Sequence, residues 1–354
     1  MLESHARWRR RGAAAALFLL VILIYRESEV TMTSDAHYTM LASVALLDGQ
    51  GLDVGSYLPR PLDPQRHPGM KLPRDPDGLP YQLMEIDGRL VPFYPPGTAV
   101  LSAPVVALMR PLGYGPFDAQ GRYDAVSEQR AMRHIAFLLT ASFIVLVFLM
   151  ASELLQLSVS FLFGLAAALA TPAWSTLSRS LWSHDWMVVL AAAAIWLLLR
   201  SATRGRPPPA IVLGTLAAWS AFVRPTGVLV LAGVGVFLLL FSPRAVLRYA
   251  VSALLWAVIF GLCFQATYGT MLPPYFTGHA MATGGWRFAE ALAGTLVSPS
   301  RGLLVFCPWI VCVAWLLWRY RRTRRSRGWV VLATAIVGAQ LLTVGTSGTP
   351  CRST

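Results

Sequence analysis

The sequence predicts an all-α, polytopic integral membrane protein with about nine transmembrane helices and a long first extracytoplasmic loop. Of the 354 residues, 55% are hydrophobic and only 13% are charged, against roughly 25% charged residues in soluble domains. Apolar runs recur along most of the chain, and backbone inside lipid must be helical because a helix satisfies its own hydrogen bonds. We therefore expect residues 1–354 to form a single transmembrane domain.

The arginines lie in short tracts between the apolar runs. A net charge of +13 would suggest nucleic acid as the partner of a soluble protein. In a membrane protein such tracts mark the cytoplasmic loops, so we expect membrane lipid and no nucleic acid among the partners. The four cysteines have no CxxC spacing. Those in or beside apolar runs are typical of small core residues, not of metal ligands or a disulfide framework.

The N-terminal segment resembles a signal peptide. Arg7 and the tract Arg9-Arg10-Arg11 precede an apolar run over residues 12–25, which is the usual order in such a segment. Arg26-Glu27-Ser28-Glu29 follows, without a small-x-small cleavage site. We therefore expect a retained signal-anchor helix over about residues 13–25, with its basic end in the cytoplasm. This helix is short for a hydrocarbon core of roughly 30 Å, so its ends snorkel or continue past the apolar part.

The first outer loop is predicted to run from about residue 26 to about residue 133. Residues 58–80 are rich in Pro, Gly and Asp, which indicates irregular structure, and residues 44–47 could form an interfacial helical turn. Gly97–Leu112 is apolar but only about 16 residues long, with Pro104 inside it. It could therefore span the membrane or lie at its surface.

Further apolar runs, each long enough or nearly so to cross the membrane, follow this loop. They cover residues 134–155, 157–177, 186–199, 210–223, 227–241, 249–267, 302–318 and 329–344. If Gly97–Leu112 stays at the surface, the later arginine tracts all share the cytoplasm with the N-terminus, as the positive-inside rule favours. The same count gathers four segments on the outer face: the loop with Asp35, and residues 178–185, 224–227 and 268–301.

Asp35 is the candidate catalytic base on this face. An acid–base step needs a carboxylate held near the reacting hydroxyl, and a carboxylate shortly after the first helix sits near the boundary between water and lipid. The spacing leaves a second interpretation open, in which Ser34 or Asp35 caps a helix that begins at Ala36.

Four more ionisable residues lie where apolar runs end at this face: Arg179, His184, Asp185 and Arg224. Ionisable residues at membrane depth are candidates for function, so His184 and Asp185 could face Asp35 and bind a sugar, a phosphate or a cation. Asp185 could equally cap the helix that begins at Trp186. Arg224 could bind a phosphate bidentately. Alternatively, its long side chain could simply extend to the membrane–water interface.

The loop over residues 268–301 adds aromatic residues and glycines. These suit stacking on a sugar, although Trp and Tyr also form the ordinary interfacial belt. Arg301 precedes the next helix and could meet a phosphate. The sequence has no Walker, dinucleotide-binding, HExxH or GxSxG motif, so nucleotide-driven transport by this chain is unsupported.

Several short motifs follow one another along most of the chain. After the first helix they are Ser34-Asp35-Ala36-His37-Tyr38, Phe93-Tyr94-Pro95-Pro96-Gly97, Trp182-Ser183-His184-Asp185, Arg224-Pro225-Thr226-Gly227, Tyr268-Gly269 and Ser298-Pro299-Ser300-Arg301-Gly302-Leu303-Leu304. Their order resembles the GT-C superfamily of membrane glycosyltransferases, which includes protein O-mannosyltransferases, aminoarabinose transferases and oligosaccharyltransferase catalytic subunits.

The resemblance implies inverting transfer of a sugar from a polyprenyl-phosphate carrier to a glycan, lipid or protein acceptor outside the membrane. Asp35 would be the catalytic base, and Asp185, with His184 beside it, would be the second acidic position. Some family members bind a divalent metal at that position and others use none, so a metal is possible and no cofactor is assigned. The expected substrate-binding residues are His37, Tyr94, Arg179, His184, Asp185, Arg224 and Arg301.

The chain departs from the family pattern in two respects. It has a single acid at Asp35 instead of an Asp-Asp, Asp-Glu or Asp-x-Asp pair. It also stops directly after an apolar run, where relatives usually continue, so we expect a truncated C-terminus.

Two alternative functions stay open: a membrane transporter or lipid flippase, and an inactive truncated transferase that acts as a scaffold. The composition fits a multi-pass protein of a bacterial inner membrane with its active site on the periplasmic or extracellular face.

Overall fold

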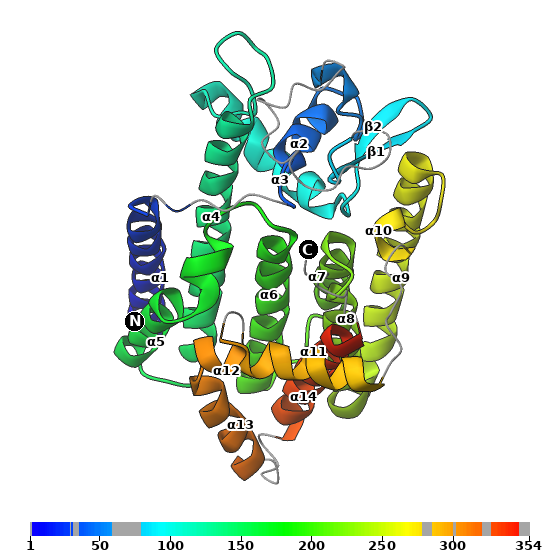
Figure 1. The fold of residues 1–354 in the computed structure, drawn as a ribbon. Helices are drawn as coiled ribbons and strands as arrows, with labels where there is room; N and C mark the ends of the chain where they lie inside the picture. Colours follow the sequence, from blue (N-terminus) through cyan, green and yellow to red (C-terminus); the bar gives the residue numbers. More distant parts are fainter. Residues whose placement is uncertain are drawn as a thin grey trace.

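The computed structural model describes residues 2–28, 30, 35–58, 79–277, 285–299, 302–320 and 327–346. Over these ranges the chain is mainly helical and contains one β-hairpin. Figure 1 shows a bundle of helices and, at one end of it, a smaller cap that contains α2, α3, β1 and β2. The predicted helical class is confirmed, and the hairpin is a feature that the sequence patterns did not reveal.

The bundle consists of α1 and of the helices that follow the cap. Their bounds are α1 Leu2–Arg26, α4 Ala125–Ala151, α5 Leu157–Leu169, the π-helical segment Ala173–Leu177, α6 Ser183–Thr203, α7 Ala210–Val223, α8 Gly227–Phe241 and α9 Pro243–Tyr268. Helix α7 packs against α6, α8 and α9, and α4 packs against α1, α5 and α6. Among the described helices, α4, α6 and α9 are long and apolar enough to cross a membrane.

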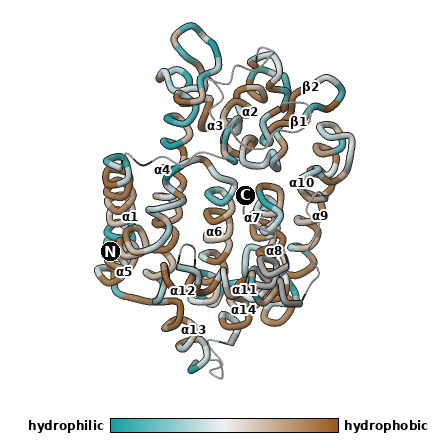
Figure 2. The backbone as a smooth tube through the Cα atoms, viewed as in Figure 1, coloured by the Kyte–Doolittle hydropathy of each residue, from teal (hydrophilic) through white to brown (hydrophobic). Residues whose placement is uncertain are grey.

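The outward surface of the bundle is apolar. Figure 2 shows mainly hydrophobic bundle helices, with hydrophilic segments concentrated in the cap and near helix ends. Leu239, Leu254 and Leu262 are 60%, 66% and 59% exposed. Monomeric soluble proteins rarely leave large apolar patches uncovered, so this surface favours membrane association.

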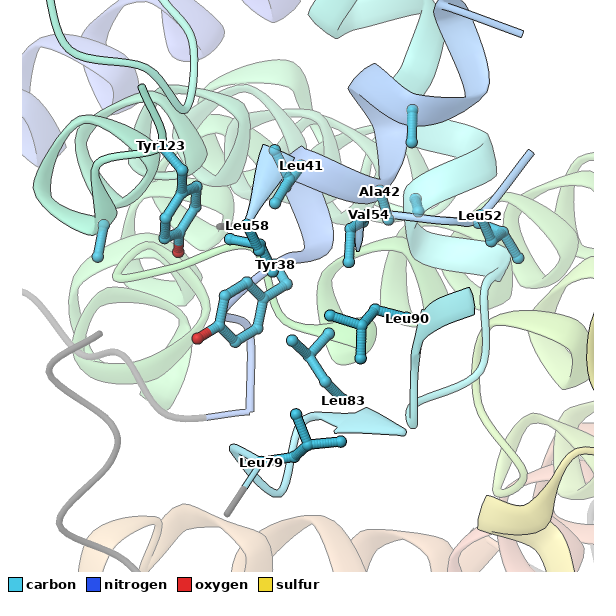
Figure 3. Packing of buried hydrophobic residues seen from close by; sticks show 13 residues of the cluster. Tyr38, Leu41, Ala42, Leu52, Val54, Leu58, Leu79, Leu83, Leu90 and Tyr123 are labelled. Atoms are coloured by element: carbon cyan, nitrogen blue, oxygen red, sulfur yellow. The ribbon is translucent and has the colours of Figure 1, made fainter. Parts of the chain in front are cut away.

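The cap is built from the first outer loop. It contains α2 Thr39–Leu47, a 3₁₀ turn at Gly55–Tyr57, β1 Leu83–Ile86, β2 Arg89–Pro92, and α3 Gly97–Met109 with a further 3₁₀ turn at Arg110–Leu112. The strands pair antiparallel, and Asp87 and Gly88 close the hairpin at φ values of 51° and 76°, as a two-residue hairpin turn requires. Buried side chains from α2 and the hairpin, among them Leu41, Leu83 and Leu90, form one core (Figure 3).

Helix α3 belongs to this cap. It packs against α2, and the Ser43 hydroxyl of α2 donates to the Ala99 carbonyl at 2.9 Å. The structure thus groups Gly97–Leu112 with the first loop, which is one of the two arrangements that the sequence left open.

Ionic contacts show which helix ends lie together. Glu153, just after α4, is 2.8 Å from Arg10 of α1 and 3.6 Å from Arg204 after α6. The N-terminal end of α1 and the connections after α4 and α6 therefore share the end of the bundle away from the cap (Figure 1). The connections after the π-helical segment, α7 and α9 lie at the opposite end, next to the cap.

Several helix boundaries differ from the predicted ones. Helix α4 begins at Ala125, because the Asp124 carboxylate caps it by accepting the Ser127 N–H at 2.8 Å, so the first loop ends before residue 133. The apolar run over residues 157–177 is broken near Pro172 between α5 and the π-helical segment. Residues 302–318 are split at Cys307 and Pro308 into α12 Leu303–Phe306 and α13 Trp309–Tyr320.

The segment after α9 also differs from the expected outer loop. It contains α10 Pro274–Thr277, near the cap, and α11 Gly285–Val297, which lies at the other end of the bundle beside α14 (Figure 1). In this structure α11 therefore lies apart from the cap, with which residues 268–301 were expected to share one face, and the side of the membrane on which α11 lies stays a prediction. Helix α14 Arg327–Thr346 packs on α8, and residues 347–354, on which the expected truncation rests, lie outside the described ranges.

Candidate functional site

A small cavity of about 70 Å³ lies where the cap meets the bundle. It is lined by Asp35, Ala36, Thr39, Tyr94, Pro95, Thr98, Leu181, Trp182, Ser183, His184, Arg224 and Tyr275. Four residues proposed from the sequence are thus brought together: Asp35, Tyr94, His184 and Arg224. They come from four segments far apart in the sequence, which gives the cavity a carboxylate, a guanidinium, an imidazole and a phenol.

Asp35 lies in a turn that precedes α2. Its Oδ1 accepts a hydrogen bond from the Tyr81 hydroxyl at 2.9 Å, which orients the carboxylate in the cavity wall. The helix itself begins at Thr39, with Tyr38 as its N-cap. The alternative in which Asp35 caps a helix that starts at Ala36 is therefore wrong, while Ser34 lies outside the described residues.

Arg224 follows the last residue of α7 and turns its side chain toward the start of α6. Its Nη1 donates to the Ser183 hydroxyl at 2.9 Å and lies 3.5 Å from Nδ1 of His184. Burial lowers the pKa of the Arg224 guanidinium, and the nearby Tyr275, Asp35 and Tyr94 raise it in part. Arginine remains protonated under these conditions, so the cavity holds a fixed positive charge opposite Asp35.

Aromatic side chains form another wall. The rings of Tyr94 and Tyr275 have centroids 5.1 Å apart. Burial raises the pKa of the Tyr94 phenol, and the charge of Asp35 and a hydrogen bond to it raise it further. The Tyr94 hydroxyl therefore stays protonated as a donor near the Asp35 carboxylate. Tyr268, at the end of α9, holds the segment that precedes Tyr94, because its hydroxyl donates to the Pro92 carbonyl at 3.1 Å.

Two glycines of the predicted motifs allow the segments of the site to approach closely. A Cβ added to Gly97, at the start of α3, would lie 2.7 Å from the Val223 backbone, next to Arg224. A Cβ added to Gly227, at the start of α8, would lie 2.0 Å from the Ser220 carbonyl oxygen. Both distances are far below normal contact. A side chain at Gly97 would push the segment that bears Tyr94 away from the backbone next to Arg224, and a side chain at Gly227 would distort the turn between α7 and α8 that bears Arg224.

Glu128 is an important residue that the sequence reasoning missed. Its carboxylate is fully buried and accepts the N–H groups of Tyr38 and Leu41, both at 3.0 Å, and the Tyr123 hydroxyl at 2.8 Å. Tyr38 has a left-handed backbone with φ of 65°, which is uncommon for a residue other than glycine. Glu128 thus fixes the turn that follows Asp35. A carboxylate within an apolar helix is the signal that could have identified it.

Among the described residues, three other predicted site residues do not line the cavity: Asp185, Arg179 and His37. Asp185 Oδ2 accepts the Trp182 N–H at 2.9 Å, and α6 begins at Ser183 with Trp182 as its N-cap. The alternative in which Asp185 caps a helix that begins at Trp186 is therefore wrong, and Asp185 instead binds the N-cap backbone from within the first turn of α6. Arg179 is buried and donates to the Ser28 hydroxyl and, at 3.3 Å, to the Val30 carbonyl. His37 is also buried, and Arg301 lies outside the described residues.

Comparisons with known proteins give no relative for this chain. No protein-family model matches the sequence, and no curated protein or solved structure matches it either. Within the described ranges, no three His, Cys, Asp or Glu side chains are grouped as metal ligands would be. The chemistry of the cavity is therefore inferred from its own side chains.

Proposed function

We propose that this protein is a membrane glycosyltransferase that moves a sugar from a polyprenyl-phosphate carrier to an acceptor hydroxyl. The observation that carries the proposal is that Asp35 and Arg224 line one cavity at the end of an apolar bundle. Such a reaction needs a base for the acceptor proton and a cation for the departing phosphate. Asp35 would supply the first and Arg224 the second.

The placement of the other side chains fits these two tasks. The Tyr81 hydroxyl orients Asp35, and its carboxylate, with about four lone-pair sites, would keep capacity to accept the acceptor hydroxyl as well. Ser183 and His184 hold the Arg224 guanidinium, so that its other nitrogens can meet a phosphate as paired donors. Tyr94 and Tyr275 offer aromatic faces against which a sugar ring would stack.

The size of the cavity limits how substrates can bind. Its volume of about 70 Å³ corresponds to about two water molecules at roughly 30 Å³ each. We therefore propose that only the reacting groups enter it, with the sugar and the lipid tail outside. Movement of Tyr275 on the short helix α10 would widen the entrance.

The proposed membrane arrangement follows the bundle. Helix α1 and helices α4 to α9 would cross the membrane, and the apolar runs over residues 302–318 and 329–344 would bring the count to about nine. The arginine-rich end that includes Arg10 and Arg204 would lie in the cytoplasm. The cap and its cavity would then face the periplasm or the exterior of a bacterial inner membrane, where the lipid-linked donor and a glycan, lipid or protein acceptor would meet.

Purified protein incubated with a panel of polyprenyl-phosphate sugars tests this proposal. The wild type is expected to transfer or hydrolyse one donor, and Asp35→Asn should reduce that rate by roughly 10²-fold or more, as is typical for loss of a catalytic base. Asp118→Asn, at an exposed turn of the cap, is the matched control and should retain wild-type activity. No turnover by folded wild type with any donor would contradict the proposal and favour a scaffold, a transporter or a lipid flippase instead.

A further inference from the structure

A second, larger pocket lies away from the cavity described above, between the end of α1 and the first turns of α4. Its volume is about 330 Å³. It is lined by Arg26, Val126, Gln129, Arg130, Arg133, His134 and Phe137. No residue is shared with the Asp35 cavity, so the proposed transfer reaction does not account for this pocket.

Three basic residues of this pocket lie on α4. Arg130, Arg133 and His134 are spaced at i, i+3 and i+4, which places them on one face of a helix. Arg133 Nη2 donates to the Arg26 carbonyl at 3.3 Å, which joins the two helices. Arg133 also lies over the Phe137 ring, with its guanidinium carbon 5.1 Å from the ring centroid. Its Nε is buried and has no hydrogen-bond partner within the described chain.

These positive charges are not neutralised by the protein in the ranges that the structure describes. The ion pairs found there involve Arg10, Arg110, Arg122 and Arg204, and none involves an arginine of the pocket. The nearest acid in the helix, Glu128, is occupied by Tyr38, Leu41 and Tyr123. The positive charge of Arg133 also affects Arg179. Burial lowers the pKa of the Arg179 guanidinium most, and the charge of Arg133 lowers it further.

We propose that this pocket binds the phosphate group of an anionic phospholipid. Guanidinium groups recognise phosphate through paired, charge-assisted hydrogen bonds, and basic pockets between membrane helices are suited to anionic head groups. Exposed leucines lie on both helices within about one turn of pocket residues. Leu23 precedes Arg26 by three residues and is 58% exposed, and Leu138 follows His134 by four residues and is 38% exposed. An acyl chain would contact these leucines, whereas a soluble phosphate would make no use of them.

Lipid retention by the purified full-length protein tests this site. Native mass spectrometry would compare bound phosphatidylglycerol with bound phosphatidylcholine for the wild type and for Arg130→Gln/Arg133→Gln. The wild type is expected to retain phosphatidylglycerol preferentially, and the double variant should lose that preference by roughly tenfold, since charge-assisted contacts to phosphate are lost. The matched control is Arg244→Gln/Arg248→Gln, which removes the same charge from exposed positions on α9 and should bind like the wild type.

Three outcomes would overturn the proposal. If both double variants lost the preference for phosphatidylglycerol equally, the preference would come from general attraction by positive charge and not from the pocket. Unchanged retention in Arg130→Gln/Arg133→Gln would exclude the pocket. Displacement of the lipid by millimolar inorganic phosphate alone would assign the pocket to soluble phosphate. Because Arg133 packs on Phe137, the exposed single variant Arg130→Gln provides the same test, with a smaller expected loss, if the double variant fails to fold.

This site is independent of the proposed transferase. Asp35→Asn is expected to retain phosphatidylglycerol like the wild type, because Asp35 does not line the pocket. Failure of the transfer assay would therefore leave the lipid result intact, and the two proposals are separately testable.

Discussion

Arg224 is held by a geometry that lysine could not reproduce. Its Nη1 contacts both Ser183 and His184, and the guanidinium still has further donors in a planar fork, whereas an ammonium group is a point charge. Arg224→Lys is therefore expected to raise the KM for the lipid-linked donor by roughly tenfold with a smaller change in kcat, since paired contacts to phosphate would be lost.

Steady-state kinetics with the donor identified in the panel would measure this effect. Arg122→Lys is the control, because Arg122 forms an exposed ion pair with Asp118 in a loop of the cap. A normal KM in Arg224→Lys would remove Arg224 from the donor-binding role and leave it as a link between α6 and α7.

Single residues were predicted from the sequence with uneven success. Asp35, Tyr94, His184 and Arg224 belong to short motifs, and those motifs meet at one cavity. Asp185 and Arg179 were proposed for the same site because each lies near a helix end. An ionisable residue there can bind a substrate or make a structural contact, and sequence spacing does not distinguish these two roles. Their contacts are with the Trp182 backbone in one case and with Ser28 and Val30 in the other.

Among the elements, α3 approaches α7 through Gly97. Gly97→Ala would place a methyl group 2.7 Å from the Val223 backbone, and backbone cannot yield as a flexible side chain does. We expect a loss of about 1–3 kcal/mol in the free energy of unfolding together with reduced transfer activity, because Tyr94 and Arg224 flank this contact. Gly115→Ala is the matched control, since a Cβ there meets nothing within 4 Å.

Thermal unfolding in detergent and the transfer assay would measure the two effects of Gly97→Ala. Wild-type behaviour of both the stability and the activity would show that the two helices can separate without disturbing the site. Loss of stability with full activity would confine Gly97 to a packing role.

Helix α2 depends on a carboxylate from another element. Glu128→Gln replaces an acceptor of three hydrogen bonds by an amide with one acceptor oxygen. At least one buried backbone N–H would then lose its partner, at a cost of about 1–3 kcal/mol. The melting temperature should fall, and transfer activity should fall with it because the turn after Asp35 loses its support. Glu290→Gln, at an exposed position of α11, should leave both unchanged, and an unchanged melting temperature in Glu128→Gln would contradict this account.

The elements that the sequence predicted best are those with strong boundary signals. Helices α7 and α8 match the apolar runs over residues 210–223 and 227–241, because Pro209 and Arg224-Pro225 mark their limits. The β-hairpin escaped prediction because each strand has only four residues, too few to show an alternating pattern. The start of α4 was placed too late because its first turns are polar, and only the Asp124 cap marks the true beginning.

At the scale of the whole molecule, the bundle predicts which surfaces face opposite sides of a membrane. Gln120 is exposed in the cap and Arg206 is exposed at the far end of the bundle. In a cysteine-free background, Gln120→Cys should react with an impermeant maleimide in intact cells. Arg206→Cys should react only after permeabilisation, as expected for an arginine-rich cytoplasmic end. Labelling of both positions in intact cells would contradict the proposed orientation.

The same labelling decides where α11 lies. A count of about nine spans places residues 269–301 outside, so we expect Glu290→Cys to be labelled like Gln120→Cys. The structure instead sets α11 beside α14 at the far end. Labelling of Glu290→Cys only after permeabilisation would favour that position and reduce the number of spans.

The contact between Arg10 and Glu153 has a consequence for biosynthesis. The two residues are 143 positions apart in the sequence, and at about 5–20 residues per second a ribosome needs roughly seven to thirty seconds to make that length. In the proposed membrane arrangement, α1 would stand in the membrane during this interval without the ion pair that joins it to the residue after α4. Assembly of the bundle would therefore include a delay, in which the first helix stays inserted by its own apolar surface until α4 is made.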